Sequence, residues 1–202
     1  MQTLKNTILS RIYGHGRGWV FTPKHFADLA DPNVVSAILH QLQKNGPIRR
    51  VAHGIYDYPK SHPKLGQLSP SLEAVMEALK TREGISFQPT GAYAANILGL
   101  SEQVPAKVVF FTNGKSRKIQ IGKRTIELKK TSERNISLAG TISGLVVEAL
   151  RYLGAKHITE NHLKKLSKAL PEKEKKKLKA HLRYSPIWMR PSLLEIIGKE
   201  MA

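Results

Sequence analysis

The stretch NGPIRRVAHGIYDYP, residues 45–59, decides the fold of the N-terminal part of the chain. A turn leads into the run 48–51, His53-Gly54 interrupts the chain, and the run 55–58 follows. Both runs carry β-branched or aromatic residues, and a short break with glycine between two such runs is typical of a β-hairpin. The stretch therefore predicts a two-stranded ribbon with two adjacent arginines on one arm.

The residues before this ribbon predict the helices of a winged helix-turn-helix. Apolar residues at helical spacing predict a helix over 3–13, and the apolar run 19–21 predicts a short strand. Thr22 and Asp31, each followed by proline, are N-cap signals that open two further helices. The third helix is then expected to enter the major groove of DNA, with the ribbon as the wing beside it.

The third predicted helix, which ends at the turn Asn45-Gly46, separates apolar from polar residues at helical spacing. Its apolar stripe consists of Val35, Ile38, Leu39 and Leu42. Its opposite face consists of Asn33, Ser36, Ala37, His40, Gln41 and Lys44. Asparagine and glutamine are suited to bidentate contacts with adenine, and no acidic residue interrupts this face. The pattern predicts a recognition helix.

The predicted DNA-binding surface extends beyond this helix. Adjacent residues of a strand point to opposite faces, so one arginine of the ribbon is expected to reach a phosphate or the minor groove while the other lies over the helix. The glycine of the tip permits close approach to the DNA backbone. Outside the helix, the predicted contact residues are Arg17, Thr22, Lys24, Arg49, Arg50 and His53. The alternative is that this winged helix binds a protein, as many such domains do.

The distribution of charge supports a polyanionic partner. The 202 residues include 33 Lys or Arg against 15 Asp or Glu, a formal net charge of +18. Such an excess favours nucleic acid or, less readily, an anionic membrane surface. The net charge is +6 over residues 1–66, −1 over 67–114, +6 over 115–134 and +7 over 135–202, which predicts at least two cationic surfaces. The alternative is a generally basic, solvated exterior.

The rest of the chain predicts a second domain. Prolines and a glycine mark residues 61–70 as a linker or a rigid arm between a winged-helix domain at 1–60 and a C-terminal domain at 71–202. Alternating apolar residues predict three strands, at 107–112, 117–121 and 124–130. Helical patterns follow them. The expected fold class is α+β: a winged helix-turn-helix, then a mixed α/β domain with a small sheet and a C-terminal helical segment.

The predicted C-terminal domain has two candidate partner surfaces. The first is a basic surface on the sheet, formed by Arg117, Lys118, Arg124 and Lys130. These side chains are expected on the face opposite the apolar ones, and the alternative is a solvated outer face without a partner. The second is the helix 91–100, where Tyr93 and Asn96 lie three residues apart and could face a partner together. Alternatively, this helix only packs tightly on the sheet.

The sequence offers little support for catalysis. Glu127 and Lys129 match half of a metal-dependent nuclease motif, but no acidic residue between Val104 and Thr125 supplies the other half. A divalent cation needs several oxygen ligands, the eight histidines are scattered, and cysteine is absent. We therefore expect no catalytic residue, no metal and no cofactor. The alternative function is a degenerate or metal-dependent nuclease-like protein that acts on DNA through the central sheet.

Membrane insertion is not expected either. No run approaches the ~18 consecutive apolar residues of a spanning helix, and the first residues lack the apolar block of a signal peptide. The sequence therefore predicts a cytoplasmic protein without a membrane partner.

Four stretches, taken together and in this order, resemble a known bacterial family. They are TILSRIYGHGRGWVFTP (7–23), IRRVAHGIYDYPKSHPKLGQLSP (48–70), QPTGAYAANILGLSEQVPAKVVFFTNG (88–114) and LRYSPIWMRP (182–191). They resemble the AbiEi-like antitoxins of type IV toxin–antitoxin systems, which implies a role in phage defence. The resemblance also implies a winged-helix domain that binds double-stranded DNA at its own promoter and represses its own operon. The C-terminal domain would counteract a nucleotidyltransferase-like toxin, directly or indirectly.

Overall fold

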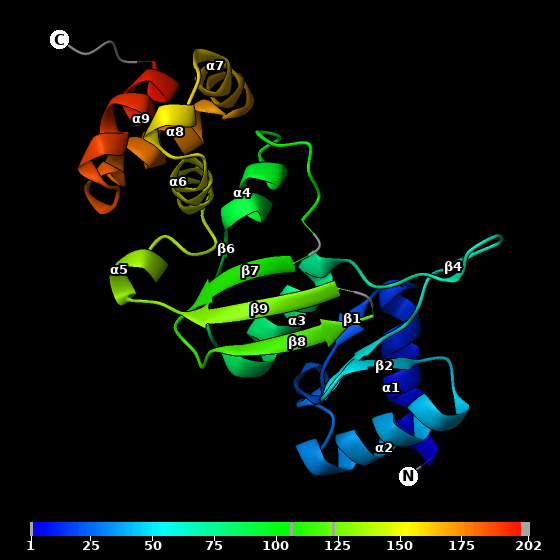
Figure 1. The fold of residues 1–202 in the computed structure, drawn as a ribbon. Coiled ribbons are helices and arrows are strands. Elements are labelled where there is room, and N and C mark those ends of the chain that lie inside the picture. The colour runs from blue at the N-terminus through cyan, green and yellow to red at the C-terminus, as the bar shows by residue number, and fades with distance from the viewer. Residues whose placement is uncertain (1, 106, 123, 199–202) are drawn as a thin grey trace. The chain divides into compact units, whose positions relative to one another are not determined.

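The structure is a computed structural model that describes residues 2–105, 107–122 and 124–198. The chain divides into two compact units (Figure 1). The first unit comprises residues 1–85 together with 120–123, and the second comprises residues 86–119 and 124–202. The boundary therefore lies later in the chain than the expected domain start at residue 71.

The first unit has the element order of a winged helix-turn-helix. Its elements are α1 (Gln2–His15), β1 (Val20–Phe21), the 3-10 helix η1 (Pro23–Phe26), α2 (Pro32–Asn45), β2 (Arg49–Ala52), β3 (Ile55–Asp57), β4 (Ser61–His62), β5 (Gly66–Gln67) and α3 (Leu72–Glu83). The strands β1, β3 and β2 form an antiparallel sheet in that order. The predicted ribbon is therefore confirmed as the hairpin of β2 and β3.

The core of this unit forms around the predicted apolar stripe of α2. Val35, Ile38, Leu39 and Leu42 are all buried, as expected from their spacing. They pack with buried side chains of α1 and with Phe21 and Phe26, both of which are fully buried. A sheet and three helical elements thus share one core, as a stable layered domain requires.

The second helix of the motif is shorter than expected. It is a single 3-10 turn that ends at Phe26, and Asp31, which as the residue before Pro32 disfavours the helical conformation, separates it from α2. Thr22 begins this turn with a reciprocal cap, in which its backbone N–H donates to Nδ1 of His25 at 3.1 Å. Arg11 of α1 then ties the turn to the first helix by donating to the carbonyl oxygen of His25 at 2.8 Å.

The segment 61–70 is not a plain linker but contains paired strands, which agrees with the alternative of a rigid arm. It contains the two-residue strands β4 and β5, which pair antiparallel with Ser61 opposite Gln67. Helix α3 follows after the N-cap Ser71, whose hydroxyl accepts from the N–H of Ala74. Its apolar face lies against β1, β3 and η1, so α3 completes the first unit instead of opening the second.

The second unit is a mixed α/β domain. Its strands are β6 (Phe87–Thr90), β7 (Lys107–Thr112), β8 (Arg117–Ile121) and β9 (Arg124–Lys130), with the last two residues of β8 counted in the first unit. Its helices are α4 (Gly91–Ile97), α5 (Glu133–Ile136), α6 (Ile142–Leu153), η2 (Ala155–His157), α7 (Glu160–Ala169), α8 (Glu172–Ala180), η3 (Leu182–Tyr184), η4 (Ile187–Met189) and α9 (Arg190–Ile197). Three strands have the bounds that the sequence predicts.

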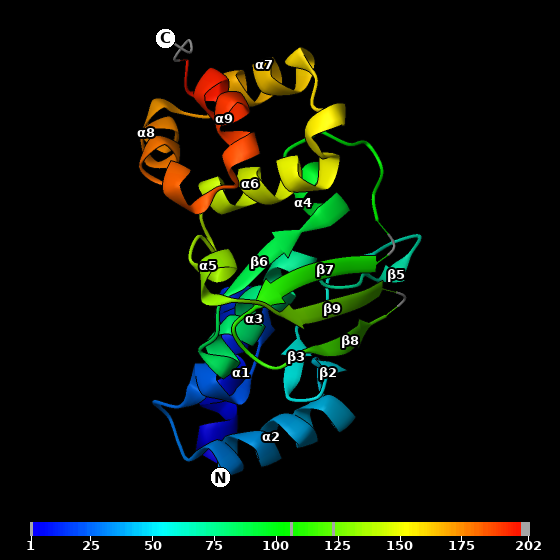
Figure 2. The same cartoon turned by 60° about the vertical axis from the view of Figure 1, so that its left-hand side comes forward.

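The second unit has a sheet and a helical cluster. The sheet order is β6-β7-β9-β8, with β7 antiparallel to β6 and parallel to β9. Figure 2 shows α6, α7, α8 and α9 grouped together, with α4 beside α6. Their buried side chains form one core that includes Ala94, Ala95, Leu150 and Leu166. The small residues of α4 therefore serve close packing. No helix of the described residues is long and apolar enough to cross a membrane.

The cap at Thr22 makes part of the stability depend on pH. Burial lowers the pKa of His25 below its ordinary value of 6.5. As the pH falls below about 6.5, the unfolded chain binds this proton before the folded chain does, so the free energy of unfolding falls. We expect His25→Gln to lose less free energy of unfolding at acidic pH than the wild type, because glutamine can accept the same cap hydrogen bond and does not titrate. Urea unfolding at several pH values measures this free energy for both proteins.

The exposed histidine of α2 provides the control for this measurement. His40→Gln should leave the pH dependence of the wild type in place. If His25→Gln and the wild type lose the same free energy of unfolding between neutral and acidic pH, the cap does not depend on a neutral His25.

Candidate nucleic-acid interface

Helix α2 presents a polar face opposite its buried stripe. Asn33, Ala37, His40, Gln41 and Lys44 are exposed, in agreement with the predicted face. Ser36 is half-buried, and its hydroxyl donates to the carbonyl oxygen of Pro32 at 2.7 Å, so it stabilises the first turn. The helix contains no acidic residue. Its exposed face therefore offers hydrogen-bonding side chains and one cation without a charge that repels phosphate.

The start of α2 is fixed by its N-cap. The carboxylate of Asp31 accepts from the N–H of Asn33 at 2.8 Å. A capping carboxylate also interacts favourably with the positive end of the helix dipole. The cap holds Asn33 in the first turn of α2.

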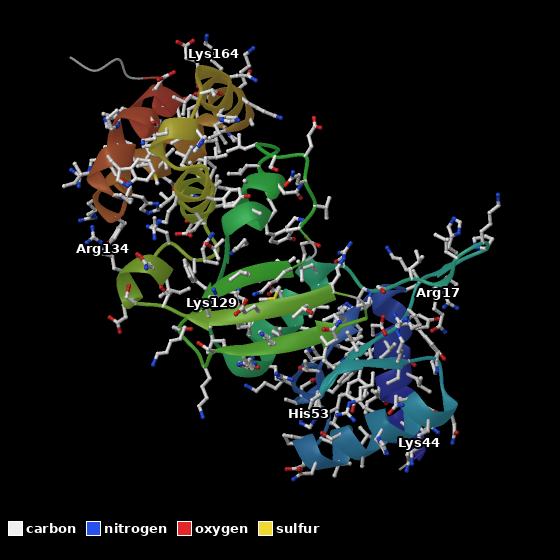
Figure 3. The ribbon with its side chains drawn as sticks, in the orientation of Figure 1. Arg17, Lys44, His53, Lys129, Arg134 and Lys164 are labelled. Carbon is white, nitrogen blue, oxygen red and sulfur yellow. The ribbon has the colours of Figure 1, made fainter. Side chains whose placement is uncertain are left out.

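The wing is a short hairpin with a glycine at its tip. Gly54 has a φ of 65°, in the left-handed region that favours glycine. Arg50 is exposed on β2 and donates to Nδ1 of His53 at 2.9 Å. Arg82 of α3 donates to the carbonyl oxygen of His53 from the other side. The tip is thus held in place, and Figure 3 shows where His53 and Lys44 lie.

The two arginines of the ribbon have different roles. Arg49 contacts Asp57, its cross-strand neighbour, through Nε at 3.1 Å and through Nη2 at 2.6 Å. Its Nη2 also donates to the carbonyl oxygen of Leu68 at 2.8 Å. The hydrogen bonds to Asp57 raise the pKa of Arg49 above its ordinary value. Because Asp57 is only 1% exposed, Arg49 is needed to compensate a buried carboxylate. Arg50 is exposed and takes no part in this buried pair.

The other predicted DNA-contact residues include two exposed side chains and one buried side chain. Arg17 and Lys24 are exposed, whereas Thr22 is fully buried beneath the start of η1, so its side chain is structural. Arg17 donates to the carbonyl oxygen of Pro59 at 3.1 Å, and its guanidinium lies 4.8 Å from the ring centroid of Tyr58. Figure 3 shows Arg17 near the base of the β4–β5 hairpin.

The acidic residues of this part of the chain all serve internal contacts. Residues 1–72 contain Asp28, Asp31 and Asp57 and no other carboxylate side chain. Asp28 binds Arg11 through two hydrogen bonds of 2.6 Å, which hold the pKa of Asp28 below its ordinary value. Asp31 caps α2 and Asp57 binds Arg49. Each negative charge is therefore matched, and the excess of cations sets the electrostatic potential of this surface.

The β4–β5 hairpin is a feature that the sequence prediction missed. Residues 60–67 are all exposed and include two lysines and a histidine. The sequence signal was the run from Tyr58 to Leu72, which contains no acidic residue. Its strands are too short, and its prolines too frequent, to give the alternation by which strands are recognised.

The predicted second basic surface is not a single face. In β9, Arg124 and Lys130 lie an even number of residues from the buried Ile126 and Leu128. In β8, Arg117 lies an even number of residues from the buried Ile121. Side chains separated by an even number of residues lie on the same face of a strand. Lys118 alone lies on the opposite face, so the expectation of one shared face is wrong.

Glu127 belongs to an ion pair in the sheet. Its carboxylate lies 2.5 Å from Nζ of Lys107, and this contact holds the pKa of Glu127 below its ordinary value, with smaller effects of Lys129 and Lys118. The described part of the chain contains no group of three or more His, Cys, Asp or Glu side chains that could hold a metal ion.

The residues proposed on α4 make internal contacts. Tyr93 lies against Phe110, with ring centroids 5.8 Å apart. Asn96 donates from its amide to the carbonyl oxygen of Ser101 at 3.1 Å. With Ala94 and Ala95 fully buried, these contacts fit the alternative in which the helix packs within its own unit.

A family model matches most of the chain. It matches a family described as a family of unknown function, DUF6088, over residues 7–178. A search of curated proteins found no match. Since the family match extends from α1 into α8 and covers well over half of the chain, the protein belongs to the DUF6088 family.

Proposed function

We propose that the protein is a sequence-specific DNA-binding repressor of its own operon and the antitoxin of a type IV toxin–antitoxin system in the bacterial cytoplasm. The observation that carries the DNA-binding part is the exposed face of α2, which has hydrogen-bonding side chains and no acidic residue. A winged helix with such a face is suited to reading base edges in the major groove.

The proposed contacts divide into those that read sequence and those that position the protein. Asn33, His40 and Gln41 supply donors and acceptors for base edges. Lys44, Arg50 and the other exposed cations of the first unit bind phosphates, which fixes the protein on the duplex without reading its sequence. We propose no catalytic role, since Glu127 is neutralised by Lys107.

The antitoxin part rests on the resemblance of four sequence stretches to AbiEi-like antitoxins. Its proposed target is a nucleotidyltransferase-like toxin, encoded by a neighbouring gene and counteracted through the second unit. The net charge of +7 over residues 135–202 is compatible with an acidic partner or with nucleic acid.

Substitutions on α2 and on the wing should have different effects on DNA binding. We expect Gln41→Ala and Asn33→Ala each to reduce discrimination against the wrong base by about 1–3 kcal/mol, because each removes a base contact. Arg50→Ala should weaken binding to specific and random duplexes alike. Titration of the full chain against DNA from upstream of its own reading frame, and against a random duplex, measures both quantities.

The outcome can reject either assignment. If Arg50→Ala changes sequence preference while Gln41→Ala and Asn33→Ala do not, the roles of helix and wing are reversed. If the wild type binds neither duplex in a salt-dependent way, the first unit is not a DNA-binding module and the protein-binding alternative gains support.

Antitoxin activity is testable by co-expression. The full chain should restore growth to cells that express the neighbouring nucleotidyltransferase-like gene. Gln41→Ala should preserve this rescue when both genes are driven by foreign promoters, because rescue is assigned to the second unit. Continued growth arrest in the presence of folded wild-type protein would contradict the antitoxin role.

A further inference from the structure

We propose that the β4–β5 hairpin, residues 60–67, is a second DNA-contacting ribbon that grips the minor-groove side of the duplex beside the site read by α2. This inference rests on the proposed DNA-binding function and adds a surface to it. The hairpin extends away from the three-stranded sheet as a narrow projection (Figure 1). Every residue from Lys60 to Gln67 is exposed.

Both ends of this hairpin are firmly attached to the winged helix. At the first end, Tyr58 exchanges backbone hydrogen bonds with Gly18 and Trp19, and Arg17 binds the carbonyl oxygen of Pro59. At the second end, the N–H of Leu68 donates to the carbonyl oxygen of Lys60 at 2.8 Å, which closes the hairpin. An exposed projection without its own core is therefore held at its base by a rigid scaffold.

The second end also ties the hairpin to the start of β2, the strand that follows α2. The carbonyl oxygen of Leu68 accepts from Arg49, which follows the end of α2 by four residues. The wing tip at His53-Gly54 lies at the other end of the same strand, β2. The first unit thus carries one ribbon at each end of β2. A helix in a major groove has a minor groove on either side, so two such ribbons can reach both flanks.

The chemistry of the hairpin matches DNA. Lys60 and Lys64 are exposed, one at the base of the hairpin and the other in the turn at its tip, so the hairpin carries a cation at each end. The stem of Lys60 lies over Gly18, where a Cβ would come within 2.5 Å of its Cε, so this lysine packs at the base of the hairpin. No acidic residue between Tyr58 and Leu72 opposes a phosphate.

The tip adds an apolar side chain to these cations. Leu65 is 72% exposed, and it follows Lys64 in a turn closed by the N–H of Leu65 donating to the carbonyl oxygen of His62. An exposed leucine next to a cation is the kind of side chain with which some proteins place an apolar wedge in the minor groove.

The test compares the full chain with its Lys60→Gln/Lys64→Gln variant. We expect the variant to unfold at the temperature of the wild type, because both side chains are exposed. The slope of log affinity against log salt concentration should be less steep for the variant, by about 2. Each lost phosphate contact reduces the magnitude of this slope by ~0.9. The affinity ratio of wild type to variant should then be about tenfold larger at 50 than at 200 mM salt. The probes are DNA from upstream of the reading frame and a random duplex of equal length.

Two further variants complete the design. Lys168→Gln/Lys173→Gln removes two exposed lysines from the second unit and is the charge-matched control, which should keep the wild-type slope. Leu65→Ser should shorten the hydroxyl-radical footprint on one flank without changing the sequence preference. Size-exclusion chromatography of Leu65→Ser should show the wild-type oligomeric state.

The outcomes separate this inference from the proposed function. If the wild type binds DNA but the hairpin variants share its affinity, salt slope and footprint, the hairpin inference is wrong and the function of α2 stands. If Leu65→Ser instead changes the oligomeric state and leaves DNA binding unaltered, the hairpin joins two copies of the chain. If the wild type fails to bind DNA, both the function and the inference are rejected.

Discussion

The pairing of Arg49 with Asp57 is the contact on which the first unit depends. A carboxylate that is 1% exposed loses its hydration, and it is tolerated in a protein interior only when a cation and hydrogen bonds replace that water. Arg49 provides both across the β2–β3 pair, and its third hydrogen bond reaches Leu68 at the end of the next hairpin. One guanidinium therefore fixes the wing register and the base of the β4–β5 hairpin, while Arg50 remains exposed.

The internal use of acidic side chains also explains the cationic surface of the first unit. Asp28, Asp31 and Asp57 are each used within the first unit, to join α1 to η1, to cap α2 and to bind Arg49. Acidic side chains are thus placed where they stabilise the fold, and they do not lie on the exposed face of α2. A surface of this kind attracts phosphate over a Debye length and then offers neutral side chains to the bases.

The sequence predicted those elements that depend on neighbouring residues alone. The stripe of α2, its Asp31 cap and the bounds of β7, β8 and β9 follow from periodicity and turn chemistry, and the structure has them as expected. The β4–β5 hairpin depends on distant contacts of Arg17 and Arg49, which no local pattern reveals. For the same reason α3 was expected in the second unit, since its apolar face does not indicate which core it joins.

At the candidate site, the sequence identified the exposed face of α2. It did not identify the burial of Thr22 or the internal role of Arg49, because both follow from tertiary packing.

Site-specific photo-crosslinking tests the central claim, that α2 reads bases, most directly. A photoreactive side chain at position 41 places the probe on the exposed face of α2, and one at position 80, on the exposed side of α3, is the control. With DNA from upstream of the reading frame bound, we predict crosslinks from position 41 to bases within the protected site, and none from position 80. A complex that forms at full affinity but crosslinks only from position 80 would contradict the claim.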